Sequence, residues 1–164
     1  MQEAEAEPTL DLLGAAALAI SSAVWETYEM EPSDAAALNV VLAEPGISVK
    51  GLSRTLGLTH SATVRVADRL ALAGLVTREP AGPGRTVALT STPRGKRLAS
   101  QAAARRMEVL ERATSGLTET QRQDLITSLA AVVRQLAASQ EQIDQACRLC
   151  DQNRCLQRGC LLPV

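Results

Sequence analysis

Four cysteines, the only ones in the chain, lie in the segment CRLCDQNRCLQRGC at residues 147–160. Their spacing, C-x2-C-x4-C-x4-C, puts four thiolate donors on one short stretch of chain. Zinc is commonly held by four cysteines from two short clips, and iron–sulfur clusters take four thiolates at wider, loop-borne spacing. We therefore expect a metal site with Cys147, Cys150, Cys155 and Cys160 as ligands, holding an iron–sulfur cluster or, as the alternative, Zn2+.

Readings without a metal are also open for these cysteines. Cys147 and Cys150 are close enough in sequence to form a regulatory disulfide, or all four thiols could stay reduced. A thiol-redox enzyme built on these two residues is disfavoured, because such dithiols gain their low pKa at the start of a helix in a βαβ unit. No Ser/His/Asp triad or carboxylate pair suggests hydrolysis, so we expect no enzyme.

The composition indicates a helical protein of one domain or two small modules. The chain has 164 residues, with Trp25 and Tyr28 as its only aromatic side chains, so Leu, Val, Ile and Ala must close the core. The start, MQEAEAEP, has no basic segment followed by an apolar one, and no apolar run approaches membrane-spanning length. We expect a cytoplasmic protein, where clustered cysteines more often bind metal than form structural disulfides.

The net charge of −1 conceals a strong asymmetry along the chain. Residues 1–49 carry nine acidic and no basic side chains, residues 50–97 carry nine basic and two acidic, and residues 98–164 carry eight basic and seven acidic. The middle third thus has a local charge of +7 (nine minus two), the sign that nucleic acid attracts. This charge also argues against a module that binds only proteins.

The middle third has the pattern of two short helices joined by a tight turn. Ser48 can cap a helix that buries Leu52 and Leu56, and Gly57 supplies the left-handed residue that ends it. Thr59 can cap the next helix, which buries Val64, Val66 or Ala67, and Leu70, and stops at Gly74. This is a helix-turn-helix pattern, and the β-prone runs LVTRE and RTVALT, joined by PAGPG, predict a wing behind it.

Longer helices flank this region. Leu10, Leu13, Ala17, Ile20 and Val24 form a stripe after Pro8, and Pro32 with Ser33 as N-cap opens a helix that stops before Pro45. Behind the wing, a helix runs from about Pro93 to Gly116. Thr118 and Gln121 then form a capping box, which opens a last long helix carrying Leu125, Leu129, Val132, Leu136 and Ile143.

The apolar stripes on the first and last helices exceed what one small module can cover. A two-fold homodimer would bury them and space two recognition helices for successive major grooves. The expected fold is mainly α with a small β-wing, and we divide the chain into four parts. These are an N-terminal dimerisation helix (1–31), a winged helix-turn-helix (32–92), C-terminal dimerisation helices (93–145) and a cysteine tail (146–164).

The stretch SATVRVADRLALAGLVTR and the hairpin end GRTVALTSTPRG resemble the MarR family of bacterial winged-helix regulators. The resemblance covers roughly residues 10–145 and is most specific between residues 48 and 97. It implies an obligate dimer that binds a pseudo-palindromic operator in double-stranded DNA and is released or rearranged by a small-molecule effector or an oxidant. We therefore expect a transcriptional regulator, with repression as its mode.

By position, the family's S-x-V-T-R-x-V-D-R-L matches the stretch from Ser61 to Leu70 in part, with Thr63 and Val64 in swapped order and Ala67 in place of a valine. Short polar side chains near the start of this helix can reach base edges or phosphates. The resemblance implies DNA contacts by Arg54, His60, Ser61, Thr63, Arg65 and Arg69. For Arg69, an ion pair with Asp68 or another surface acid is an equal alternative.

In the wing, the family has an Asp that supports the Arg entering the minor groove. Here Pro83 stands where that acid is expected, and Arg85 keeps the charge, so we expect Arg85 to insert with the loop stiffened by its prolines. The cysteine tail lies beyond the resemblance, although CRLCDQNRCL is similar to the C-x2-C-x5-C stretch of iron–sulfur WhiB-like regulators, with a second gap that is one residue shorter. A sensor needs a responsive group, which favours the cluster over a structural zinc. At the dimer end, its loss could be transmitted through the terminal helices to the wings.

Overall fold

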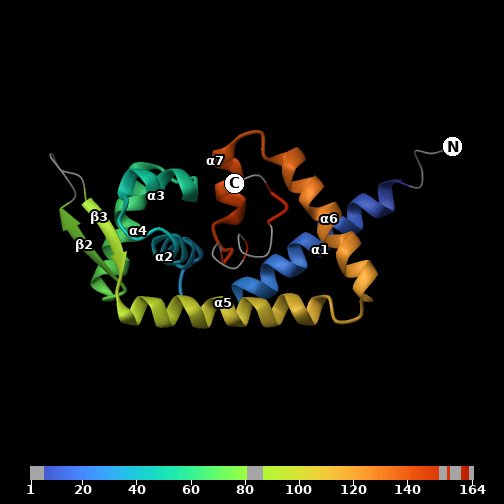
Figure 1. Cartoon of the computed structure of the whole chain (residues 1–164), viewed down its shortest axis with the longest axis horizontal. Coiled ribbons are helices and arrows are strands. Elements are labelled where there is room, and N and C mark those ends of the chain that lie inside the picture. Colours follow the sequence, from blue (N-terminus) through green and yellow to red (C-terminus); the bar gives the residue numbers. More distant parts are fainter. Residues whose placement is uncertain (1–5, 81–86, 152–154, 156–159, 163–164) are drawn as a thin grey trace.

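The structure, a computed structural model, describes residues 6–80, 87–151, 155 and 160–162. These residues form a mainly helical protein with one small antiparallel sheet, as predicted (Figure 1). In chain order the elements are α1 (Ala6–Trp25), α2 (Pro32–Ala43), β1 (Ile47–Ser48), α3 (Val49–Leu56), α4 (His60–Leu72), β2 (Val76–Pro80), β3 (Val87–Ser91), α5 (Pro93–Ala113), α6 (Glu119–Leu136) and α7 (Gln140–Cys147).

Figure 1 shows three regions in a row above the long helix α5. The sheet lies with α2, α3 and α4 at one end of α5, and α1 and α6 lie at the other end. Helix α7 lies between these two groups. No helix within the described ranges is long and apolar enough to cross a membrane.

The helix-turn-helix forms as the sequence predicts. The Ser48 side chain accepts a hydrogen bond from the Gly51 amide and caps α3, and Thr59 caps α4 by accepting from Ala62. Gly57 ends α3 with a φ of +65°, a left-handed conformation that residues with a Cβ avoid. The tight turn between α3 and α4 therefore depends on Gly57.

The sheet has the strand order β1-β3-β2, and both pairs are antiparallel. Strands β2 and β3 form the predicted wing, with Val76 opposite Ser91 and Pro80 opposite Val87. The sequence analysis missed β1, a strand of two residues whose Ile47 pairs with Leu89. This strand ties the segment before α3 to the wing.

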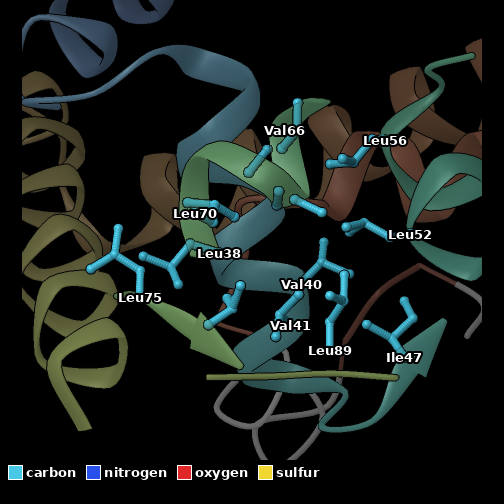
Figure 2. Packing of buried hydrophobic residues seen from close by; sticks show 14 of the residues in the cluster. Leu38, Val40, Val41, Ile47, Leu52, Leu56, Val66, Leu70, Leu75 and Leu89 are labelled. Carbon is cyan, nitrogen blue, oxygen red and sulfur yellow. The ribbon is translucent and has the colours of Figure 1, made fainter. Parts of the chain in front are cut away.

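One core holds the winged module together (Figure 2). Its most deeply buried large side chains come from α2, α3, α4 and β3, and they include Leu38, Val41, Leu52, Leu70 and Leu89. The start of α5 packs closely on this core, because a Cβ added at Gly95 would lie only 2.1 Å from the backbone oxygen of Leu75. The recognition helix and the wing are therefore fixed by the same buried residues.

Three predicted helix boundaries are wrong. Helix α1 begins at Ala6 rather than after Pro8, which fits because the first-turn amides of a helix need no intrahelical acceptor. Helix α2 has Glu31 at its N-cap without a side-chain hydrogen bond, and Ser33 lies inside the first turn. The last long helix ends at Leu136, and Ser139 caps a separate helix α7, so the expected boundary after residue 145 falls within α7.

The terminal helices expose most of their apolar side chains. On α1, Leu18 is 72% exposed and Ile20 is 40% exposed, and on α6, Leu129 is 43% and Leu136 is 77% exposed. Val24 is an exception at 7%. The apolar stripes predicted on the first and last long helices therefore lie mostly on α1 and α6. Within a single chain, most of their side chains stay exposed to solvent.

Candidate DNA-binding surface and cysteine site

The helix-turn-helix presents most of the predicted DNA-contacting side chains to solvent. His60, Ser61 and Arg65 are exposed on α4, and Arg54 is exposed near the end of α3. The hydroxyl groups of Ser61 and Thr59 lie 3.3 Å apart, so Ser61 stays close to the start of α4. The amides of this first turn and its positive dipole end suit phosphate contacts.

Thr63 does not belong to this surface, which corrects the prediction. Its side chain is 0% exposed, and its hydroxyl donates to the backbone oxygen of Thr59 at 3.0 Å. Val64, the next residue, is half-buried instead of lying in the core. The swapped order of these two residues thus puts a threonine inside and a valine nearer to the surface, and the inner threonine satisfies its hydroxyl locally.

Arg69 forms an ion pair rather than pointing freely to solvent. Its Nη2 lies 2.5 Å from Oδ1 of Asp34, and its Nε donates to Oδ2 at 2.9 Å, a two-pronged contact between α4 and α2. This hydrogen bond raises the pKa of the Arg69 guanidinium. Asp34 is 8% exposed, so the acid is a buried residue of α2, whereas the sequence analysis considered Asp68 or a surface acid. Arg69 therefore holds α4 on α2.

Asp68 is paired with Arg78, a residue that the sequence analysis did not single out. Arg78 Nη1 lies 2.5 Å from Asp68 Oδ1, and Arg78 Nη2 donates to the backbone oxygen of Val64 at 3.4 Å. These contacts join β2 to the recognition helix. A spacing of ten residues between a helix and a strand has no periodic signal, so only the folded hairpin reveals the pair.

The basic character of the middle third is a surface property. All eight basic side chains that the structure describes between residues 50 and 97 are exposed, including Lys50, Arg94, Lys96 and Arg97. The predicted wing residues Pro83 and Arg85 lie outside the described residues. Arg69 and Arg78 are paired with carboxylates, and the other six leave positive charge around α3, α4 and the first turn of α5.

The four cysteines converge on one cavity. They line a space of about 170 Å³ together with Val40 and Glu44 from the α2 end, Thr55 from α3, Gln140, Ile143 and Asp144 from α7, and Leu162. All four thiols are free and half-buried, and Cys147 is the last residue of α7. The four cysteines, up to 13 positions apart in the sequence, thus meet around one space with residues from α2 and α3.

The thiols also affect one another. Burial and the neighbouring Cys150 thiol raise the pKa of Cys147 to about 12, and burial and Cys160 raise the pKa of Cys155 to about 11. The protein without metal therefore keeps these two groups protonated at neutral pH. Among the side chains that the structure describes, no group of three or more His, Cys, Asp and Glu is arranged to hold a metal ion. His60, far from the cysteines in sequence, is an exposed residue of α4.

The segment between the first two cysteines is bonded to the winged module. Asn39 on α2 donates to the backbone oxygens of Arg148 and Cys150 at 2.9 and 3.0 Å. Arg106 on α5 donates to the backbone oxygen of Leu149 at 2.9 Å. The segment is therefore fixed to α2 and α5 of its own chain, and its expected place at the dimer end stays a prediction.

The comparisons with known proteins agree on one family. A model of the MarR family matches residues 28–85. A MarR family protein from Bacillus stearothermophilus superposes with a TM-score of 0.72 at 22% identity, covering 83% of this chain and 98% of that one. A MarR family transcriptional regulator from Rhodococcus sp. RHA1 gives 0.57 at 25% identity, with coverage of 80% and 94%. FabT of Streptococcus pneumoniae in complex with DNA gives 0.65 at 15% identity, with 80% and 95%.

Residues 28–85 match the MarR family model, and the fold of the chain is similar to that of solved MarR family proteins. The matched segment contains both ion pairs described above, Asp34 with Arg69 and Asp68 with Arg78. The four cysteines lie more than 60 residues beyond its end. The sequence matches none of the curated proteins. The MarR comparison thus accounts for the winged module and leaves the cysteine site to be argued from its own geometry.

Proposed function

We propose that this MarR-type chain is a dimeric transcriptional regulator that represses genes by binding a pseudo-palindromic operator. The observation that carries the proposal is the recognition helix α4, whose exposed His60, Ser61 and Arg65 stand on a winged module surrounded by basic side chains. Positive charge supplies affinity for phosphates, and the helix supplies contacts to base edges. The DNA in the solved complex of FabT is consistent with this use of the fold.

Dimerisation is supported by the terminal helices. The exposed leucines and isoleucines of α1 and α6 form apolar surface of the kind that soluble proteins bury against a partner. A second copy related by a two-fold axis would cover the same surface on both chains. It would also present two copies of α4 to two half-sites of one operator.

The signal is proposed to be redox state or iron, sensed by an iron–sulfur cluster on Cys147, Cys150, Cys155 and Cys160. Such a cluster supplies a centre that is assembled or lost in response to iron supply and oxidants. The four thiols line one cavity of about 170 Å³ and can supply the thiolates that either a cluster or a zinc ion takes. A sensor needs a group that responds to its signal, and this favours the cluster over a structural zinc.

Two measurements test these parts separately. Binding to DNA of the protein's own promoter region should be specific and should weaken steeply with salt, because phosphate contacts release counterions. Absence of salt-dependent binding would contradict the regulator. For the signal, protein purified without oxygen should be brown and carry iron and sulfide in stoichiometric amount. A colourless protein with one zinc per chain would instead make the tail a structural site and shift the search to a small-molecule effector.

A further inference from the structure

The cysteine segment contacts α2 and α5 of its own chain, and the contacts involve three consecutive backbone oxygens. Those of Arg148, Leu149 and Cys150 accept hydrogen bonds from Asn39 and Arg106. They belong to the residues that directly follow Cys147, the last residue of α7. Side chains of α2 and α5 therefore hold the turn after α7, where the first two cysteines lie.

Helix α7 also supports the turn between α3 and α4. Gln145 Nε2 donates to the backbone oxygen of Arg54 at 3.2 Å. A Cβ added at Gly57 would lie 3.1 Å from Cδ of Gln145, so this side chain lies directly on the left-handed turn residue. Any shift of α7 would remove a contact from the turn that sets the start of the recognition helix.

The cavity and the core connect the same elements. Val40 and Thr55, from α2 and α3, form part of the wall around the four thiols. Leu149, between Cys147 and Cys150 in the tail, packs against the hydrophobic core of the winged module. The cysteines, the turn after α7 and the core of the winged module are thus in continuous contact within one protomer.

We propose that residues 145–150 form a brace that couples the state of the four cysteines directly to the helix-turn-helix. The inference rests on the proposed cluster and names the route of its regulation. Ligated thiols fix Cys147 and Cys150, which holds the three carbonyls against Asn39 and Arg106 and keeps Gln145 on the turn. When the ligand is lost, this segment regains conformational freedom, the turn loses its support and DNA binding weakens. The terminal helices are not needed to carry the signal.

The test separates coupling from cluster binding. Asn39→Ala removes two of the hydrogen bonds and Gln145→Ala removes the contact with Arg54, yet neither changes a cysteine. Gln101→Ala, at an exposed glutamine of α5, is the matched control. Each full-length protein is reconstituted without oxygen using ferrous iron and sulfide, and one half is then stripped of iron with a chelator. Iron per chain and the Kd for promoter DNA are measured for both halves.

The wild type and the control should each bind DNA about tenfold more weakly after stripping, a usual size for allosteric coupling. The two brace variants should hold as much iron as the wild type but bind DNA with the weaker Kd in both states. Hydrogen exchange at residues 49–60 should be slowed by iron in the wild type and unchanged by iron in the variants. Because Gln145 is half-buried and belongs to no hydrophobic core, its variant keeps the test valid even where Asn39→Ala unfolds the protein.

Two failures can be told apart. A wild type that takes up no iron overturns the proposed cluster, and the brace with it. A wild type that holds iron and changes its Kd on stripping, while both variants keep the same ratio of Kd values, overturns the brace alone.

Discussion

The winged module and the terminal helices use their leucines in opposite ways. In the module, Leu38 is 1% and Leu89 is 0% exposed, and both belong to one closed core. On the terminal helices, Leu18 is 72% and Leu136 is 77% exposed. A single chain therefore buries its leucines in the winged module and leaves them exposed on the terminal helices. The difference shows that similar apolar periodicity can encode either a closed core or an exposed apolar surface.

The largest expected effect comes from breaking the interface. Leu18→Glu places a charge on a residue that is already exposed in one chain, so folding of that chain should be little affected. In a dimer it would bury an unpaired charge. We expect monomers in light scattering and a loss of affinity for a two-half-site operator of about a hundredfold, because two linked contacts become one.

Gln101→Glu, at an exposed position of α5, adds the same charge and should leave a dimer with wild-type affinity. A Leu18→Glu protein that remains a dimer would show that α1 does not contribute to the interface. The exposed leucines of α6 would then be the remaining candidates for the interface.

A substitution in the core should instead destabilise the fold of the single chain. Leu38→Ala leaves a cavity among packed residues and should lower the free energy of unfolding by about 2–5 kcal/mol. Leu72→Ala, at the end of α4, removes the same atoms from a side chain that is 89% exposed and should change it by less than about 0.5 kcal/mol. Urea unfolding of both proteins measures the difference, and equal values would mean that an interface covers Leu72.

The local features of the winged module were the most predictable from the sequence. Ser48, Gly57 and Thr59 act through hydrogen bonds and dihedral angles within a few residues, and each has its predicted role. The burial of Leu52, Leu56 and Leu70 follows from helical periodicity in the same way. Interactions between residues this close in sequence depend on the local sequence alone. The helix-turn-helix could therefore be predicted from the sequence.

Contacts between distant elements were not predictable. The pairing of Arg69 with Asp34 joins residues 35 positions apart, and the contact of Asn39 with the tail spans more than 100 positions. The burial of Thr63 was missed because its polar side chain satisfies itself on Thr59, so polarity did not indicate exposure. The break before Ser139 was missed because Leu136 and Ile143 keep a helical spacing across it. Such features depend on three-dimensional placement.

The two arginines of α4 provide a finer comparison within the module. Arg65→Ala should weaken DNA binding by about 1–3 kcal/mol and, where the contact is to a phosphate, reduce the slope of log K against log salt by about one. Arg69→Ala should leave that slope unchanged but lower the melting temperature, because Asp34 is left buried without its partner. Salt titrations of DNA binding and thermal unfolding together assign each role. A reduced slope of log K against log salt in Arg69→Ala would show that Arg69 does contact DNA.

The smallest expected effect is the pH dependence of stability that the cysteine tail causes in the metal-free protein. The pKa of Cys147 is raised from 9.0 to about 12 and that of Cys155 to about 11, so the folded state holds these protons more tightly than the unfolded state. Stability from this source is fully present below pH 9 and is lost as the pH rises through 11 to 12. Both thiols are partly exposed, so the loss should be modest. The melting temperature of the metal-free wild type should therefore fall as the pH rises above 9. The melting temperature of a Cys147→Ser, Cys155→Ser protein should depend less on pH. Identical profiles would mean that solvent reaches both thiols freely and that the cavity is open without its ligand.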